Sequence, residues 1–193
     1  MIEFLAALLF TYHTTRVPPQ YRHETEDARQ TRIRTIAQAQ VEECIENRIP
    51  GWPLKACVAL GTTIAQWESG LLEEVHSGAK KGPAGEVCLF QLHRAVTAIP
   101  DKHYRITKEE LEQSTGTDLD HTRMCVRLGM RIVRWHIKRC AIKYEGGGWS
   151  NTIALFAEYH HPDTYCHAYP LAMSSARAMS YQSLLHKLLA NQS

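Results

Sequence analysis

The hydrophobic positions of this chain recur mostly at helical spacing. From about Glu26 to Asn47, apolar residues return every three or four positions, which predicts an amphipathic helix. A short helix is expected from Thr107, because a hydroxyl with Glu110 three residues later is typical of a capping box. A long amphipathic helix begins at Asp118. Strand signal is scarce, so the pattern predicts a mainly α-helical fold, a bundle with at most a small β-hairpin.

The same pattern predicts further elements with weaker boundaries. We expect helices at Leu89–Ile99, at Trp149–His160 and after Pro170. Residues 70 to 88 are expected to form a loop, with room for a small strand pair.

The stretch from Leu54 to Ser69 is apolar nearly all round, which is typical of a helix buried in the middle of a domain. Gly70 follows its last turn and is a normal helix stop. Glu68 lies in that last turn beside Trp67. Burial, the indole and the negative end of the helix dipole all favour the neutral acid. Glu68 is therefore a candidate proton donor, such as protonates a glycosidic oxygen. The alternative is that it only ends a core helix at the surface.

The start of the chain carries a short apolar run, Phe4–Phe10. Glu3 replaces the basic residues of a signal peptide, no small-residue cleavage site follows, and the run is too short to span a bilayer. We expect a short helix docked on the domain or on a neighbouring subunit, with an unusual export signal as the alternative. Residues 16 to 24 contain Pro18-Pro19 and predict an extended linker. The expected division is therefore 1–24, an apolar segment and linker, and 25–193, one domain.

Composition narrows the classes of function. Of the 193 residues, 44% are hydrophobic and 22% charged, as is usual for a globular protein. The formal net charge of +2 is too weak to favour nucleic acid as a partner, and it is compatible with an anionic cell wall. The long helix carries a basic stripe, for which we expect a solvated face, with docking to an acidic partner as the alternative. The stripe consists of Arg123, Arg127, Arg131, Arg134 and Lys138.

Six cysteines permit three disulfides, but their spacings match no known framework. Without a clear export signal, we expect synthesis in a reducing cytosol and most cysteines as small buried apolar residues. The alternative is that disulfides form later, if the protein ends up outside a cell. Metal-ligand residue types gather at His160, His161, Asp163, Cys166 and His167. They lack the paired spacing of zinc sites, so we expect a loop beside a cleft and neither metal nor cofactor.

Three segments together resemble the soluble lytic transglycosylase family, whose members cleave peptidoglycan on a lysozyme-like α+β fold. The first is Glu68-Ser69-Gly70, followed by a loop with Ser77 and glycines. The second is Cys88-Leu89-Phe90-Gln91, where the family has Gly-Leu-Met-Gln. The third is the run Ala154–His160, which is similar to the family's Ala-Leu-Ala-Ala-Tyr-Asn-Ala-Gly. The match covers residues 54 to 162 in order.

The resemblance implies the site residues. Glu68 would be the catalytic residue, and substrate would be bound by Ser69, Ser77, Gln91 and Tyr159. Two departures concern the surroundings of the site: Cys88 stands where the family has Gly, and His160 where it has Asn. We expect Phe90 in the core.

The resemblance also implies a mechanism. Glu68 would protonate the oxygen of the β-1,4 bond between N-acetylmuramic acid and N-acetylglucosamine. As an anion it would then take the proton of the 6-hydroxyl, which closes a 1,6-anhydro ring. A glycosidase that adds water usually needs a second acid. Glu73, Glu74 and Glu86 are the nearby candidates in the sequence.

Two alternatives stay open at this stage. One is a goose-type lysozyme-like hydrolase, and the other is a non-catalytic structural or virion protein that kept the fold. The expected partners are peptidoglycan glycan strands and, through the apolar amino terminus, a virion or cell-envelope protein. We expect no transmembrane span. We expect the protein to be made in the cytoplasm and to act at the bacterial cell wall. If a phage encodes it, we expect it to be a component of the virion.

Overall fold

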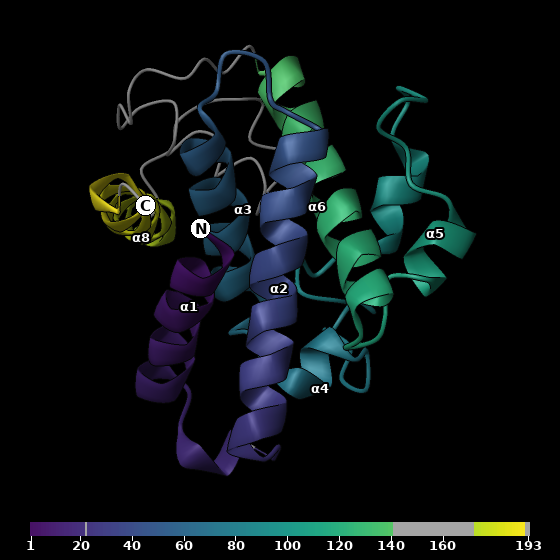
Figure 1. Cartoon of the computed structure of the whole chain (residues 1–193). Helices are drawn as coiled ribbons and strands as arrows, with labels where there is room; N and C mark the ends of the chain where they lie inside the picture. Colours follow the sequence, from purple (N-terminus) through teal and green to yellow (C-terminus); the bar gives the residue numbers. More distant parts are fainter. Residues whose placement is uncertain (22, 141–171, 192–193) are drawn as a thin grey trace.

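The computed structural model describes residues 1–21, 23–140 and 172–191. These residues form seven α-helices and essentially no strand, with one isolated bridge between Val87 and Leu92. The prediction of a mainly α-helical protein is confirmed. Figure 1 shows α2 and α6 lying side by side with α3 behind them, and α1 and α8 on the opposite side from α5.

Three long helices build the centre. They are α2 (Glu26–Glu46), α3 (Leu54–Ser69) and α6 (Leu119–Arg139), close to their predicted bounds. The Asp118 carboxylate caps α6 by accepting from the Asp120 and His121 amides at 3.1 Å. A Cβ on Gly61 of α3 would lie closer than 3.0 Å to the side chains of Gln40 on α2 and Met130 on α6. The missing side chain at this position therefore lets the three helices approach closely.

Two further helices cover α2 and α3. The apolar amino-terminal run forms α1 (Ile2–Arg16), which packs on α2 and places Leu5 and Leu9 in the common core. The expectation of a short docked helix is confirmed. The carboxy-terminal helix α8 (Ala172–Ala190) packs on α3 and buries Tyr181. Within the described residues, no helix is long and apolar enough to cross a membrane.

Short elements connect α3 to α6. They are α4 (Glu73–His76), a 3-10 helix (Arg94–Ala98) and α5 (Lys108–Glu112). The predicted capping box of Thr107 and Glu110 is present.

The predicted helix over Leu89–Ile99 is wrong. Cys88 and Gln91 have φ of +58° and +48°, which an α-helix cannot accommodate. The Val87 and Leu92 backbones pair at 3.1 and 2.9 Å instead, so the chain turns sharply between them. The expected strand pair of this loop is reduced to that single bridge. The predicted helix Trp149–His160 lies outside the described residues.

The basic stripe of α6 faces acids of the same chain. Arg131 binds Glu110 at 3.0 Å, and Lys138 binds Asp101 at 3.0 Å. The remaining three cations meet α2, with the pairs Arg123–Glu42, Arg127–Glu46 and Arg134–Glu43. Much of the stripe's charge is therefore used to hold α6 against α2 and α5.

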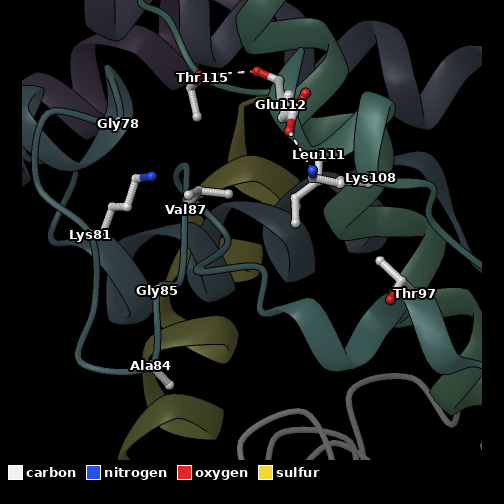
Figure 2. A pocket seen from close by; sticks show the side chains of 10 residues that line it. All are labelled: Gly78, Lys81, Ala84, Gly85, Val87, Thr97, Lys108, Leu111, Glu112 and Thr115. Atoms are coloured by element: carbon white, nitrogen blue, oxygen red, sulfur yellow. Dashed lines mark hydrogen bonds and ion pairs between the residues drawn. The ribbon is translucent and has the colours of Figure 1, made fainter.

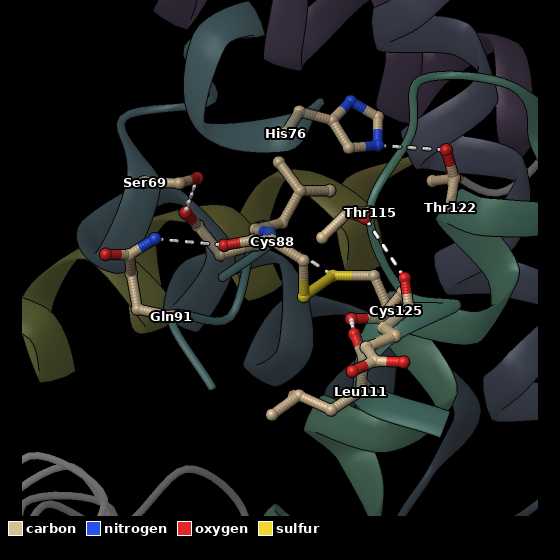
Figure 3. The surroundings of a disulfide bond; sticks show 12 residues. Ser69, His76, Cys88, Gln91, Leu111, Thr115, Thr122 and Cys125 are labelled. Carbon is tan, nitrogen blue, oxygen red and sulfur yellow. Dashed lines mark hydrogen bonds between the residues drawn. A yellow bond between two sulfur atoms is a disulfide. The ribbon is translucent and has the colours of Figure 1, made fainter. Parts of the chain in front are cut away.

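The central four cysteines are buried, as expected, and they are joined in disulfides. Cys44 and Cys57 join α2 to α3, and Cys88 joins the connecting loop to Cys125 of α6 (Figure 3). Cys140 is disulfide-bonded as well. The sequence separations of 13 and 37 gave no framework to recognise, because only the packing of the helices brings these sulfurs together. Disulfides form and persist in oxidising environments.

Candidate functional site

Glu68 opens into a pocket at the carboxyl end of α3. Gly70, with φ of +60°, ends the helix in the left-handed conformation as expected. The Glu68 side chain keeps only 13% of its surface exposed. The cavity it lines measures about 420 Å³, within the range of roughly 300–1,000 Å³ usual for small-molecule sites. The lining consists of Glu68, Glu86, Gln91, Leu92, His93, Ala95, Val96, Ile99, Ile132, Trp135 and His136.

The carboxyl of Glu68 has a raised pKa. Burial is the largest cause, because it penalises the charged form. The Arg177 guanidinium opposes this effect, and the charge of Glu86 adds to it. The predicted environment of a proton donor is therefore present, together with a cation that the sequence did not indicate.

The side chains of Gln91 and Glu86 both lie against Gly82. Gln91 Oε1 and Glu86 Oε2 both lie closer than 3.0 Å to the point that a Cβ on Gly82 would occupy. Gln91 Nε2 donates to the Cys88 carbonyl at 3.1 Å, and Glu86 Oε2 accepts from the Ala84 amide at 2.9 Å. The two side chains thus bring acceptor oxygens to the pocket that holds Glu68. Such oxygens suit the hydroxyl and amide donors of a sugar.

A disulfide holds the turn that carries Gln91. Cys88 is fully buried, and Figure 3 shows its sulfur bonded to Cys125 of α6 and its carbonyl facing the Gln91 side chain. Its φ is left-handed, a conformation that glycine adopts without strain. Cys88 is not among the lining residues, so it does not obstruct the pocket. Phe90 is fully buried, as expected, and its ring lies over Gly129.

The opposite wall comes from α6. Trp135 and His136 face the pocket, and their rings are 4.7 Å apart between centroids. Burial lowers the pKa of His136 to about 4, with a smaller contribution from Arg139. His136 is therefore neutral at neutral pH. Helical spacing puts His136 on the apolar face of its helix, but it does not show that this face meets a pocket.

The other predicted residues have different positions. Ser69 is buried in the turn after α3, where its hydroxyl donates to the Ala65 carbonyl at 2.6 Å and accepts from the Leu71 amide at 3.1 Å. Ser77 ends α4 and is half-buried. Neither serine lines the Glu68 pocket. Tyr159 and His160 lie outside the described residues, so their roles stay predictions.

A second, larger hollow lies on the other side of the 82–92 loop. Its volume is about 820 Å³, and Gly85 and Val87 line it while Glu86 between them lines the first pocket. Figure 2 shows Lys81 reaching toward this hollow and Lys108 beside Glu112, at 3.7 Å. The lining also includes Gly78, Ala84, Thr97, Leu111 and Thr115. The loop therefore separates an acid-lined pocket from a hollow of mixed charge.

Sequence reasoning missed Arg177. Its Nη1 lies 2.6 Å from Glu68 Oε1, although 109 residues separate the two in the chain. No motif or spacing marks it, since only the packing of α8 on α3 makes the contact. Glu86 was named as one of three nearby acids, and the structure places it rather than Glu73 or Glu74 in the pocket.

Within residues 1–21, 23–140 and 172–191, no group of three or more His, Cys, Asp or Glu side chains is arranged to hold a metal ion. The cluster of metal-ligand types at 160–167 lies outside these ranges. The chain matches no known protein-family model, no curated protein and no solved structure.

Proposed function

We propose that this protein is a peptidoglycan-cleaving lytic transglycosylase of lysozyme-like fold, with Glu68 as its single acid–base residue. The observation that carries the proposal is the meeting of Glu68 and Gln91 in one pocket. The two residues are 23 positions apart in the chain and come from separate segments of the family pattern.

The character of the pocket supports this assignment. Its walls combine an aromatic ring, aliphatic side chains and a few polar groups, which is typical of a small-molecule site. Trp135 offers an apolar surface to the less polar face of a sugar ring. Burial raises the pKa of Glu68, and a raised pKa is what a general acid needs near neutral pH.

The proposed reaction proceeds in two proton transfers. The protonated Glu68 carboxyl gives its proton to the glycosidic oxygen between N-acetylmuramic acid and N-acetylglucosamine. The C1–O bond then breaks, its electron pair stays with the departing oxygen, and the acetamido group of the sugar stabilises the positive charge at C1. The 6-hydroxyl attacks C1 while Glu68 takes its proton. The product is a 1,6-anhydro sugar, and Glu68 is protonated again.

The test is digestion of purified peptidoglycan followed by mass analysis of the released muropeptides. Products lighter by one water, with 1,6-anhydro ends, are expected. Glu68→Gln should lower the rate about 10²- to 10⁴-fold, because it removes the proton donor and keeps the shape of the side chain. Glu74→Gln is the matched control, since Glu74 binds Lys80 at 2.8 Å and does not line the pocket. A Glu68→Gln variant as active as the wild type would contradict the assignment.

The position of Glu86 favours a second candidate, a goose-type lysozyme-like hydrolase. A carboxylate in the same pocket as the acid can activate water or assist its attack. This enzyme would leave reducing ends, and Glu86→Gln would abolish its activity. In the transglycosylase, Glu86→Gln should leave anhydro products, because no water is added.

The disulfides bear on where the protein acts. Bonds between Cys44 and Cys57 and between Cys88 and Cys125 suit an oxidising location such as the bacterial cell wall. Cleavage there, by a wall-penetrating or virion-carried enzyme, is the setting we propose. A folded protein that releases no muropeptide would instead favour a structural descendant of the fold.

A further inference from the structure

The carboxy-terminal helix brings a buried cation to the candidate acid. Arg177 on α8 keeps 5% of its side chain exposed, and its Nη1 lies 2.6 Å from Glu68 Oε1. Its guanidinium carbon also lies 5.8 Å from the centre of the Trp67 ring, within reach of a cation–π interaction. Two neighbouring side chains of α3 therefore hold the same guanidinium.

Titratable and charged groups approach Glu68 from three directions. Arg177 approaches from α8, Glu86 and His93 from the connecting loop, and His136 from α6. Burial keeps His136 neutral, because its pKa is lowered to about 4. Among these groups, Arg177 and Glu86 are the two that act on the Glu68 pKa, and they act in opposite directions.

We propose that Arg177 is a positioning residue that controls the orientation and the charge of the Glu68 carboxyl. The inference rests on the proposed function of Glu68. Contact with Oε1 restrains the rotation of the carboxyl group, and the guanidinium stabilises the anion that remains after Glu68 gives up its proton. The same contact makes Glu68 a stronger acid and a weaker base, so α8 favours the first proton transfer over the second.

The inference predicts opposite effects for the two charged neighbours. Arg177→Gln removes the cation and should move the titration midpoint of Glu68 to higher pH. Glu86→Gln removes an anion and should move it to lower pH. Arg177→Lys keeps the charge but loses the planar group and should stay nearer the wild type. Arg29→Gln is the matched control, because Arg29 is a buried arginine of α2 beside Phe10, 5.1 Å from its ring centre.

Two measurements separate the inference from the proposed function. The first is a ¹³C NMR titration of the Glu68 carboxyl in each variant, assigned with Glu68→Gln. The second is the pH profile of kcat/KM on a soluble peptidoglycan fragment. Activity requires protonated Glu68, so the profile falls as pH rises through the Glu68 pKa. Its high-pH limb should therefore move with the NMR midpoint. Loss of positioning should lower kcat of Arg177→Gln about 10- to 100-fold, with KM little changed.

The outcomes are distinct. An unchanged NMR midpoint of Glu68 in Arg177→Gln overturns the inference. A midpoint that moves while the high-pH limb of kcat/KM in the active variant stays fixed also overturns it. If Arg177 had a merely structural role, its substitution would lower stability but would move neither the NMR midpoint of Glu68 nor the high-pH limb of kcat/KM. If wild-type protein cleaves no glycan while the midpoints shift as expected, the proposed function fails and control of the carboxyl by Arg177 stands. If Arg177→Gln does not fold, Arg177→Lys decides: its kcat should fall although its NMR midpoint stays near the wild type, and an unchanged kcat overturns the inference.

Discussion

Cys88 combines two constraints in one residue. Its φ of +58° places it in the left-handed region, which costs a residue with a Cβ roughly 1–2 kcal/mol. Its sulfur is bonded to Cys125, so the disulfide offsets that cost while it holds the turn of Gln91. The residue thus carries a Cβ and still keeps a backbone conformation that glycine adopts without strain.

This interpretation predicts a difference between two double variants. Both Cys88→Gly/Cys125→Ala and Cys88→Ala/Cys125→Ala lose the disulfide, but only the alanine keeps a Cβ at positive φ. The glycine variant should be more stable by about 1 kcal/mol. Urea unfolding of both proteins in the same buffer measures the difference. Equal stabilities, or a more stable alanine variant, would show that the turn does not keep this conformation.

At the residue scale, sequence reasoning was strongest where one segment contains its own signal. Glu68 was named as a candidate because an acid stands in the last turn of an apolar helix, and Gln91 because it lies in a segment that resembles a family motif. The structure places both residues in one pocket. Arg177 and Trp135 could not be found in this way. Their relation to Glu68 depends on how α8 and α6 pack against α3, and local spacing carries no information about that packing.

At the scale of the helices, the ion pairs that hold α6 to α2 differ in how far they are buried. Glu43 keeps 3% of its side chain exposed and is bound by Arg134 and by the Asn47 amide at 2.9 Å. Arg134 also donates to the Asn47 carbonyl at the end of α2. Arg123 and Glu42 form a pair that is 41% and 28% exposed. The buried pair should therefore matter more for stability than the exposed one.

Arg134→Ala should lower the free energy of unfolding by about 2–3 kcal/mol, because it leaves the Glu43 carboxylate buried with weaker compensation. Arg123→Ala, one end of the exposed pair, should cost about 0.2–1 kcal/mol. Chemical denaturation of the two variants beside the wild type gives both values. Similar small losses in both would mean that water reaches Glu43.

The elements themselves were predictable where periodicity and caps agree. For α2, α3, α5 and α6, helical spacing coincides with a cap or a stop such as Thr107, Asp118 or Gly70. The error at Leu89–Ile99 has a physical reason. In the segment Cys88–Leu92 the four apolar residues are buried and Gln91 is half-buried, and apolar content alone does not separate a buried turn from a buried helix.

For the whole molecule, a buried histidine links stability to pH. His76 is fully buried, and its Nε2 lies 2.9 Å from Thr122 Oγ1. Burial, assisted by the charge of Arg32, lowers the His76 pKa to about 3, whereas an unfolded histidine titrates near 6.5. Between these values the unfolded chain binds the extra proton, so stability falls as pH decreases from about 6.5 toward 3.

His76→Gln should weaken this pH dependence. Between pH 7 and pH 5 the wild type should lose about 2 kcal/mol more than the variant, since each pH unit below 6.5 costs at most about 1.4 kcal/mol. Urea unfolding at a series of pH values measures the free energy of unfolding of both proteins and gives this difference. His103→Gln, at an exposed position, is the control and should follow the wild type. Parallel curves for all three proteins would exclude His76 as the source.

The Cys44–Cys57 and Cys88–Cys125 disulfides should differ in what they protect. They close segments of 13 and 37 residues, so loss of Cys44–Cys57 should cost about 3 kcal/mol and loss of Cys88–Cys125 about 4 kcal/mol. Amide hydrogen exchange should distinguish them better than stability. Exchange in residues 82–92 should accelerate in Cys88→Gly/Cys125→Ala and much less in Cys44→Ala/Cys57→Ala. Equal acceleration would mean that the turn is held by packing alone.

The contact between Glu68 and Arg177 also constrains when this site can form during synthesis of the chain. A ribosome adds about 5–20 residues per second, so the 109 residues from Ser69 to Arg177 take roughly 5–20 s to synthesise. During that interval α1 and α2 have already been made, while Arg177 does not yet exist. The contact between Glu68 and Arg177 can therefore form only after α8 has followed α3 out of the ribosome.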